Sequence, residues 1–137
     1  MNKIYIPFQL PAIHQYREAS KVTGGSVFNI VDIEQTVSEM SKCSCIIAGH
    51  LHAVILSILM KKPVVILPLR VKLRALAEEN NLTGLVANTQ DEILFKLEEL
   101  MHQSVDYDDV ILLNRQKANK ALEILREALN KFRENGQ

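Results

Sequence analysis

The sequence lacks tryptophan, has only two cysteines among 137 residues and carries no long uninterrupted apolar run. Its longest apolar stretch, residues 53–60, is interrupted by Ser57 and is far shorter than the roughly 18 to 20 residues of a membrane-spanning helix. The first residues show no sustained apolar core before a small-residue cleavage site, so we expect no signal peptide and a cytoplasmic protein. Sixteen basic residues balance sixteen acidic ones, and this zero net charge argues against nucleic acid as a partner.

The two cysteines, Cys43 and Cys45, stand two positions apart in an apolar segment. Alternate side chains of a strand point the same way without coming close enough for a low-strain disulfide. The chain has no second cysteine pair, and His50 and His52 lie in a different register, so a zinc site is the weaker interpretation. We expect buried thiols in a reducing compartment, with no metal and no cofactor.

Hydrophobic residues make up 47% of the chain, enough for one folded domain over residues 1–137. From residue 26 onward, short apolar segments alternate with segments of helical periodicity, which is typical of parallel βαβ units. We therefore predict a three-layer, doubly wound, Rossmann-like α/β domain with helices on both faces of a parallel sheet. The expected strands are residues 3–8, 26–30, 43–48, 64–67 and 84–87. The expected helices are one opening at Asp32, then 51–60, 71–80, 90–102 and about 107–134, while residues 12–25 are expected to form a loop.

Two of the expected strands are almost continuously apolar, which indicates burial on both faces. Ile46, Ile47 and residues 64–67 are the predicted core positions of these strands. The last helix has one apolar stripe, in which Leu122, Leu125 and Leu129 recur at steps of three and four. We expect the stripe to pack on the domain's own sheet. A coiled-coil seam is the alternative, although the stripe spans barely two heptads.

Candidate binding residues follow the two apolar strands. Ligands of open parallel sheets bind beyond the carboxyl ends of the strands, where helix N-termini offer free amide donors. After the first strand, Gly49 permits close backbone approach, and the imidazoles of His50 and His52 can donate to an anionic ligand. The alternative is that one histidine caps the helix and the other packs against the core.

The turn after the second strand carries three cations. Arg70 and Lys72 can hold a phosphate or carboxylate at the start of the next helix, whereas we expect Arg74 to be solvated. An ordinary charged surface is the alternative interpretation of this cluster. We assign Lys61 and Lys62, at the C-terminal end of the preceding helix, to solubility and to compensation of the helix dipole. The sequence contains no Walker A, G-x-S-x-G or G-x-G-x-x-G pattern, which weakens the case for nucleotide or ester hydrolysis.

Residues 41–82 resemble the C-terminal domain of the polysaccharide pyruvyl transferase family. That family has an R-L-H-A segment after a buried strand, an apolar helix, a proline-containing entry to the next strand, and a lysine in the following turn. Leu51, His52 and Ala53 match the last three residues of that segment. Pro63 matches the strand entry, and Lys72 matches the lysine. The chain departs from the family at residue 50, which is histidine instead of arginine, at residue 61, which is lysine instead of a common glycine, and at residues 69–71, which replace tyrosine, aspartate and proline.

The resemblance implies the C-terminal half of a GT-B-like architecture, in which two Rossmann-type halves face a cleft. It implies phosphoenolpyruvate, or another phosphorylated small molecule, as donor and a sugar of a surface polysaccharide as acceptor. By resemblance His52 is the catalytic acid or phosphate ligand, His50 a weaker substitute for arginine, and Lys72 a more distant site residue. With Gly49 and Arg70 from the two turns, these residues form the expected donor site. We expect the domain to be inactive without an N-terminal half, so a partner domain or a homo-oligomer is implied.

Two other functions stay open. One is a non-catalytic binding or assembly module. The other is the nucleotide-sugar-binding C-terminal domain of a GT-B glycosyltransferase. Such a domain usually has a glutamate that binds the donor ribose, and Glu78 and Glu79 lie too far along their helix for that role.

For the favoured function we predict that His52 and Lys72 converge on one anion site, which binds phosphate-type ligands better near pH ~6 than near pH ~8.

Overall fold

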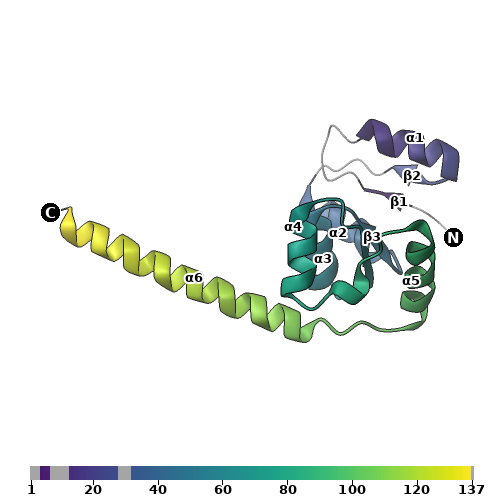
Figure 1. The fold of residues 1–137 in the computed structure, drawn as a ribbon. Helices are drawn as coiled ribbons and strands as arrows, with labels where there is room; N and C mark the ends of the chain where they lie inside the picture. Colours follow the sequence, from purple (N-terminus) through teal and green to yellow (C-terminus); the bar gives the residue numbers. More distant parts are fainter. Residues whose placement is uncertain (1–3, 7–12, 28–31, 137) are drawn as a thin grey trace. The chain divides into compact units, whose positions relative to one another are not determined.

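The computed structural model describes residues 4–6, 13–27 and 32–136 (Figure 1). The chain divides into two compact units, Met1–Val105 and Asp106–Gln137. The first unit is mixed α/β, which confirms the predicted α/β class but not the three-layer, doubly wound arrangement, because the described strands form two separate two-stranded sheets; the second unit is a long helix. In chain order the elements are β1 (Ile4–Tyr5), α1 (Ile13–Thr23), β2 (Ser26–Val27), α2 (Ile33–Ser41), β3 (Ile46–Ala48), α3 (Leu51–Leu59), β4 (Val64–Ile66), α4 (Val71–Glu79), the 3-10 helix η2 (Thr83–Leu85), α5 (Gln90–His102) and α6 (Asp108–Asn135).

The described strands form two parallel pairs. In the first, β1 pairs with β2, and residues 3, 7–8 and 28–30 of the expected strands lie outside the described part of the chain. In the second, β3 pairs with β4 so that Ile47 lies opposite Val65. The strand expected at residues 84–87 is replaced by η2 and an isolated parallel bridge between Val86 and Ile66. This bridge extends the β3–β4 pair by one short contact on the β4 side.

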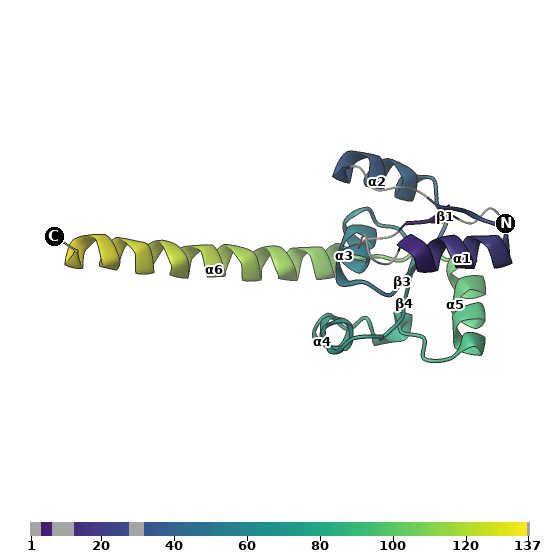
Figure 2. The ribbon, with the colours of Figure 1, turned by 90° about the horizontal axis from the view of Figure 1, so that it is seen from above.

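The core of the first unit is built around β4. Val64, Val65 and Ile66 have no exposed surface, which confirms the prediction for these three residues, whereas Leu67 is half-buried. Figure 2 shows α3 on one side of β3 and β4 and α5 on the other. Val65 clusters with Ala87 and with Leu100 of α5. Because side chains alternate along a strand, Val64 and Ile66 point to the opposite side, so β4 is covered on both faces.

The prediction that Ile47 of β3 is buried is wrong, since its side chain is 48% exposed. Ile47 and Val65 are register partners and therefore point to the same side of the pair. The α5 cluster covers Val65 but does not extend over Ile47. An apolar strand sequence indicates that both faces of the strand can be buried. It does not indicate how far along the sheet the covering helix, here α5, extends.

Two helices begin with the side-chain caps that their sequences predict. Asp32 Oδ1 accepts a hydrogen bond from the Gln35 N–H at 2.8 Å at the start of α2. At the start of α5, Thr89 Oγ1 accepts one from the Glu92 N–H at 3.2 Å. The Glu92 carboxylate in turn accepts a hydrogen bond from the backbone N–H of Asn88, which lowers the pKa of Glu92. Each cap satisfies backbone donors that the helix itself leaves free.

The prediction of a loop over residues 12–25 is wrong, because α1 occupies most of that segment. Gly24 has a φ of 67°, and the backbone N–H groups of Gly24 and Gly25 both donate to Ser20 O, at 2.9 and 3.3 Å. This is the arrangement in which glycine terminates a helix. The two glycines therefore mark the end of a helix rather than the middle of a loop.

The second unit consists of α6, whose bounds lie one residue from the predicted ones at each end. The Asp106 carboxylate accepts a hydrogen bond from the Asp108 N–H at 2.9 Å at its start. Leu122, Leu125 and Leu129 are 54 to 59% exposed, so the prediction that they are buried is wrong. This unit contains no other described helix or strand that could cover the stripe. Neither α6 nor any other helix in the described part of the chain is both long and apolar enough to cross a bilayer.

Candidate functional site

The two candidate turns leave the same edge of the β3–β4 pair. The strands are parallel, so their carboxyl ends meet at one edge, where the Leu67 N–H donates to Ala48 O at 2.9 Å. A methyl group on Gly49 would come within 2.9 Å of Leu69 Cδ1. The turn that carries His50 therefore lies against the turn that leads to Arg70. The atom that this methyl group would meet is the end of an exposed, flexible side chain, so a larger residue at position 49 would displace the Leu69 side chain.

His50 and Arg70 occupy equivalent positions at the starts of α3 and α4. Both have extended backbone, and among the described residues neither side chain caps its own helix. Neither helix has an acidic residue in its first turn. The amide donors at the starts of α3 and α4 thus have no capping side chain, whereas those of α2 and α5 do. Two uncapped helix N-termini next to each other make this edge electropositive.

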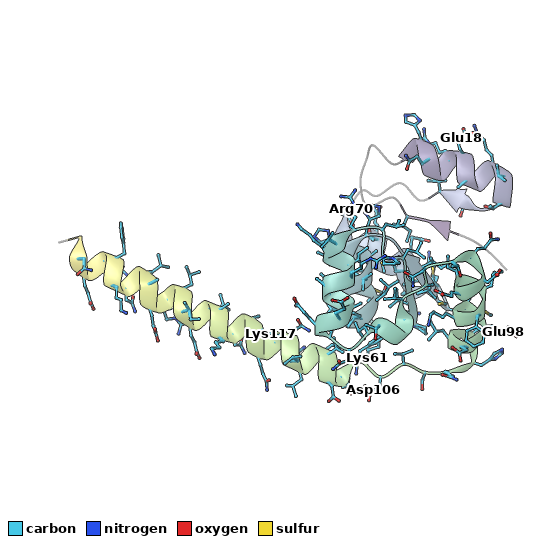
Figure 3. The ribbon with its side chains drawn as sticks, viewed as in Figure 1. Glu18, Lys61, Arg70, Glu98, Asp106 and Lys117 are labelled. Atoms are coloured by element: carbon cyan, nitrogen blue, oxygen red, sulfur yellow. The ribbon has the colours of Figure 1, made fainter. Side chains whose placement is uncertain are left out.

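The remaining site candidates are on the surface beside these helix starts. His52 and Lys72 are exposed, and His50 is half-buried. Of the two histidines, His50 does not cap α3 and His52 does not pack into the core, so the structure does not support the cap-and-core alternative. Figure 3 shows Arg70 at the upper end of α4 and Lys61 at the lower side of the first unit, as expected from their places at opposite ends of their elements in the sequence.

Lys62 has a structural role that the sequence did not reveal. Its ammonium donates to Ser41 O at 2.5 Å and to Cys43 O at 2.9 Å. The side chain therefore reaches back to the carbonyls at the end of α2, instead of compensating the dipole of α3. These contacts fix the segment between α2 and β3, and so they help to set the position of the strand that carries the Gly49 turn.

A cavity of about 380 Å³ opens next to the second turn. It lies between the segment after β4 and the start of α5, and Arg74 is the charged residue in its wall. None of the five predicted site residues lines it. The described lining residues are Leu67, Pro68, Leu69, Arg74, Ala87, Asn88, Thr89, Gln90 and Ile93.

Two features of the sequence indicate this cavity, although neither belongs to the predicted site. Thr89 has the spacing of a helix cap, and it follows the weakly strand-like residues 84–87. Together these place a third helix start at the carboxyl edge of the sheet. Arg74, which was expected in solvent, is indeed exposed but also borders the cavity.

The two cysteines are free and half-buried. Burial raises the pKa of both thiols, and the Cys43 Sγ lies 3.6 Å from Glu39 O. Within residues 4–6, 13–27 and 32–136, no group of three or more histidine, cysteine or acidic side chains could hold a metal ion.

The fold and the site together define an α/β domain with an electropositive turn region at the carboxyl edge of a parallel strand pair. A family model described as polysaccharide pyruvyl transferase matches residues 4–69, a little under half of the chain. This match confirms the resemblance seen in the sequence. It includes Gly49, His50 and His52 and ends one residue before Arg70. No curated protein and no solved structure matches the chain.

Proposed function

We propose that this chain is the donor-binding part of a polysaccharide pyruvyl transferase-like protein. In this proposal the edge formed by the Gly49 and Leu69 turns holds a phosphorylated donor such as phosphoenolpyruvate. The acceptor is a sugar of a surface polysaccharide. The family match over residues 4–69 supports the class of reaction, and the turn geometry supports the place of binding.

One observation carries the proposal, namely the direct approach of the two turns. The parallel pairing of β3 with β4 brings two uncapped helix starts to one edge of the sheet, where the Leu69 side chain lies against Gly49. Amides at helix starts bind phosphate oxygens well because they are unpaired donors at the positive end of the helix dipole. The two capped helices, α2 and α5, instead have one of these donors satisfied by a side chain of the chain itself.

Each predicted site residue has a distinct role in this proposal. The Gly49 backbone lets the ligand approach, while Arg70 and Lys72 hold the negative charge of the donor. His52 is the proton donor or phosphate ligand. His50 stands where the family has arginine, and an imidazole lacks the permanently charged fork of a guanidinium. We therefore expect donor binding to be tighter near pH ~6 than near pH ~8.

We further propose that catalysis needs a second, N-terminal half that faces this edge, as in a GT-B-like pair of Rossmann-like domains. The transferred group and the acceptor sugar must be held together, and an open edge of one domain leaves the acceptor side unbounded. The chain alone then binds the donor without transferring it.

The test is a titration with phosphoenolpyruvate followed by amide NMR, at pH ~6 and pH ~8. Wild type is expected to bind more tightly at pH ~6. His52→Ala is expected to weaken binding about tenfold, the effect of losing one charge-assisted hydrogen bond. His102→Ala is the matched control, because His102 is also exposed but lies at the far end of α5, and it should bind like wild type.

Three outcomes would contradict the proposal. These are no spectral change at either pH, equal loss in both histidine variants, and a preference for a nucleotide-sugar over phosphoenolpyruvate. The last result would instead favour the nucleotide-binding half of a glycosyltransferase.

A further inference from the structure

The helix α6 presents an apolar stripe that no described element of its unit covers. Leu122, Leu125 and Leu129 are 54 to 59% exposed, and Phe132 is 77% exposed. Figure 3 shows side chains projecting from α6 along its whole length. The stripe follows the alternating steps of four and three that form the seam of a coiled coil. Its apolar positions are Ala118, Leu122, Leu125, Leu129 and Phe132, and the same spacing continues back to Arg115 and Ile111, so that the seam has seven positions.

Between Arg115 and Phe132, the order of residues along this seam is self-complementary when it is read from the two ends of that segment toward the middle, and Ile111 lies outside the segment. The resulting pairs are Arg115 with Phe132, Ala118 with Leu129, and Leu122 with Leu125. The outer pair joins a cation to an aromatic ring, the next joins a small side chain to a large one, and the inner one joins two leucines. Two copies of α6 that run in opposite directions place these residues opposite each other in six successive layers.

A parallel arrangement lacks this complementarity. In a parallel pair in register, Arg115 would face Arg115 of the second copy inside the seam, which brings two like charges together where they are partly desolvated. Ala118 would face Ala118 and leave the layer underfilled. In the antiparallel arrangement the guanidinium of Arg115 instead lies over the ring of Phe132, which is a favourable cation–π geometry.

The positions that flank the seam agree with the antiparallel direction. Arg126 comes opposite Asn119 of the second copy, so no two cations meet. Ala121 comes opposite Ala128, and these small side chains let the helices approach. The charged residues Lys117, Lys120 and Glu127 lie on positions away from the seam and stay in water.

We propose that α6 pairs with α6 of a second copy of this chain as an antiparallel coiled coil. A lone helix in water is only marginally stable, and covering its apolar face supplies most of its stability. The pairing of Arg115 with Phe132 and of Ala118 with Leu129 identifies the occupant of that face as a second α6, because each of these residues finds its partner on the same stripe of another copy. This inference does not depend on the proposed donor site.

The first test measures the mass of the full chain in solution by light scattering over a range of concentrations. Wild type is expected to reach twice the chain mass of 15.5 kDa. Leu125→Asp is expected to give the mass of one chain. Ile124→Asp is the matched control, because Ile124 is as exposed as Leu125 but lies off the seam, and it should stay dimeric. A wild type that has the single-chain mass at every concentration overturns the proposal, as does equal dissociation by both substitutions.

The second test measures the direction of the helices with paired spin labels in a Cys43→Ala, Cys45→Ala background whose thermal melt matches wild type. Labels at Glu134→Cys should be separated by on the order of 30 Å, because each lies about 21 residues of helix from its counterpart. Labels at Glu123→Cys, near the centre of the pairing, should be much closer together. Short distances at both positions would show a parallel pair and overturn the proposal.

Discussion

Replacing Val65 by alanine tests the packing around β4 most simply. Val65 is fully buried and lies in the cluster with Ala87 and Leu100. The substitution removes two methyl groups, worth about 0.8 kcal/mol each in lost burial, and it leaves a small cavity. We expect the free energy of unfolding to fall by about 2 to 3 kcal/mol.

The matched comparison is Ile47→Ala at the register partner of Val65 on β3. This change removes three carbons, but the side chain is 48% exposed, so roughly half of the burial energy is at stake. We expect a loss of only about 1 kcal/mol, although more atoms are deleted.

Both variants are unfolded with denaturant, and the unfolding is monitored by circular dichroism. The two transitions are comparable if the free energy of unfolding falls with denaturant concentration at the same slope in both variants. The reasoning fails if Ile47→Ala costs as much as Val65→Ala. That result would mean that β3 is covered on both faces after all, as its sequence suggests.

Three further outcomes follow from local geometry. Glu92→Gln should lower the melting temperature at pH 7 but not near pH 3. The pKa of Glu92 is lower in the folded chain than in the unfolded chain, so the carboxylate stabilises the fold above about pH 4.5. This stabilisation is lost as the pH falls through the pKa that Glu92 has in the folded chain. Gly24→Ala should cost about 1 kcal/mol in the stability of α1, measured by amide exchange, because its φ of 67° disfavours any side chain although space is open around it. Cys43 and Cys45 should react with iodoacetamide more slowly than a free thiol at pH 8, because burial raises the pKa of both, and rates equal to those of a model thiol would contradict this.

Much of the secondary structure of this chain could be predicted because local signals determined it. Asp32 and Thr89 cap their helices as their spacing indicates, and α5 has the predicted bounds. The prediction over α1 was wrong because glycines such as Gly24 and Gly25 occur both at helix ends and in loops. Which applies depends on hydrogen bonds to Ser20 that the sequence does not display.

The errors about burial have a different cause. The apolar patterns of Ile47 and of the α6 stripe identify faces that favour burial. What covers such a face is decided by elements far away in the sequence or by another chain, so the pattern alone cannot show it. The candidate site shows the same division. The rule for parallel sheets predicts that the turns after β3 and β4 lie at one edge, whereas the cavity bordered by Arg74 depends on how the start of α5 packs beside the segment after β4.

If the Gly49 and Arg70 turns form one anion site, a map of amide shifts during a phosphoenolpyruvate titration at pH ~6 shows it directly. We expect the amides of Gly49, His52 and Lys72 to shift together along one binding curve, while that of Lys61, at the other end of α3, stays unchanged. Shifts confined to one of the two turns, or separate curves for the two turns, would contradict it.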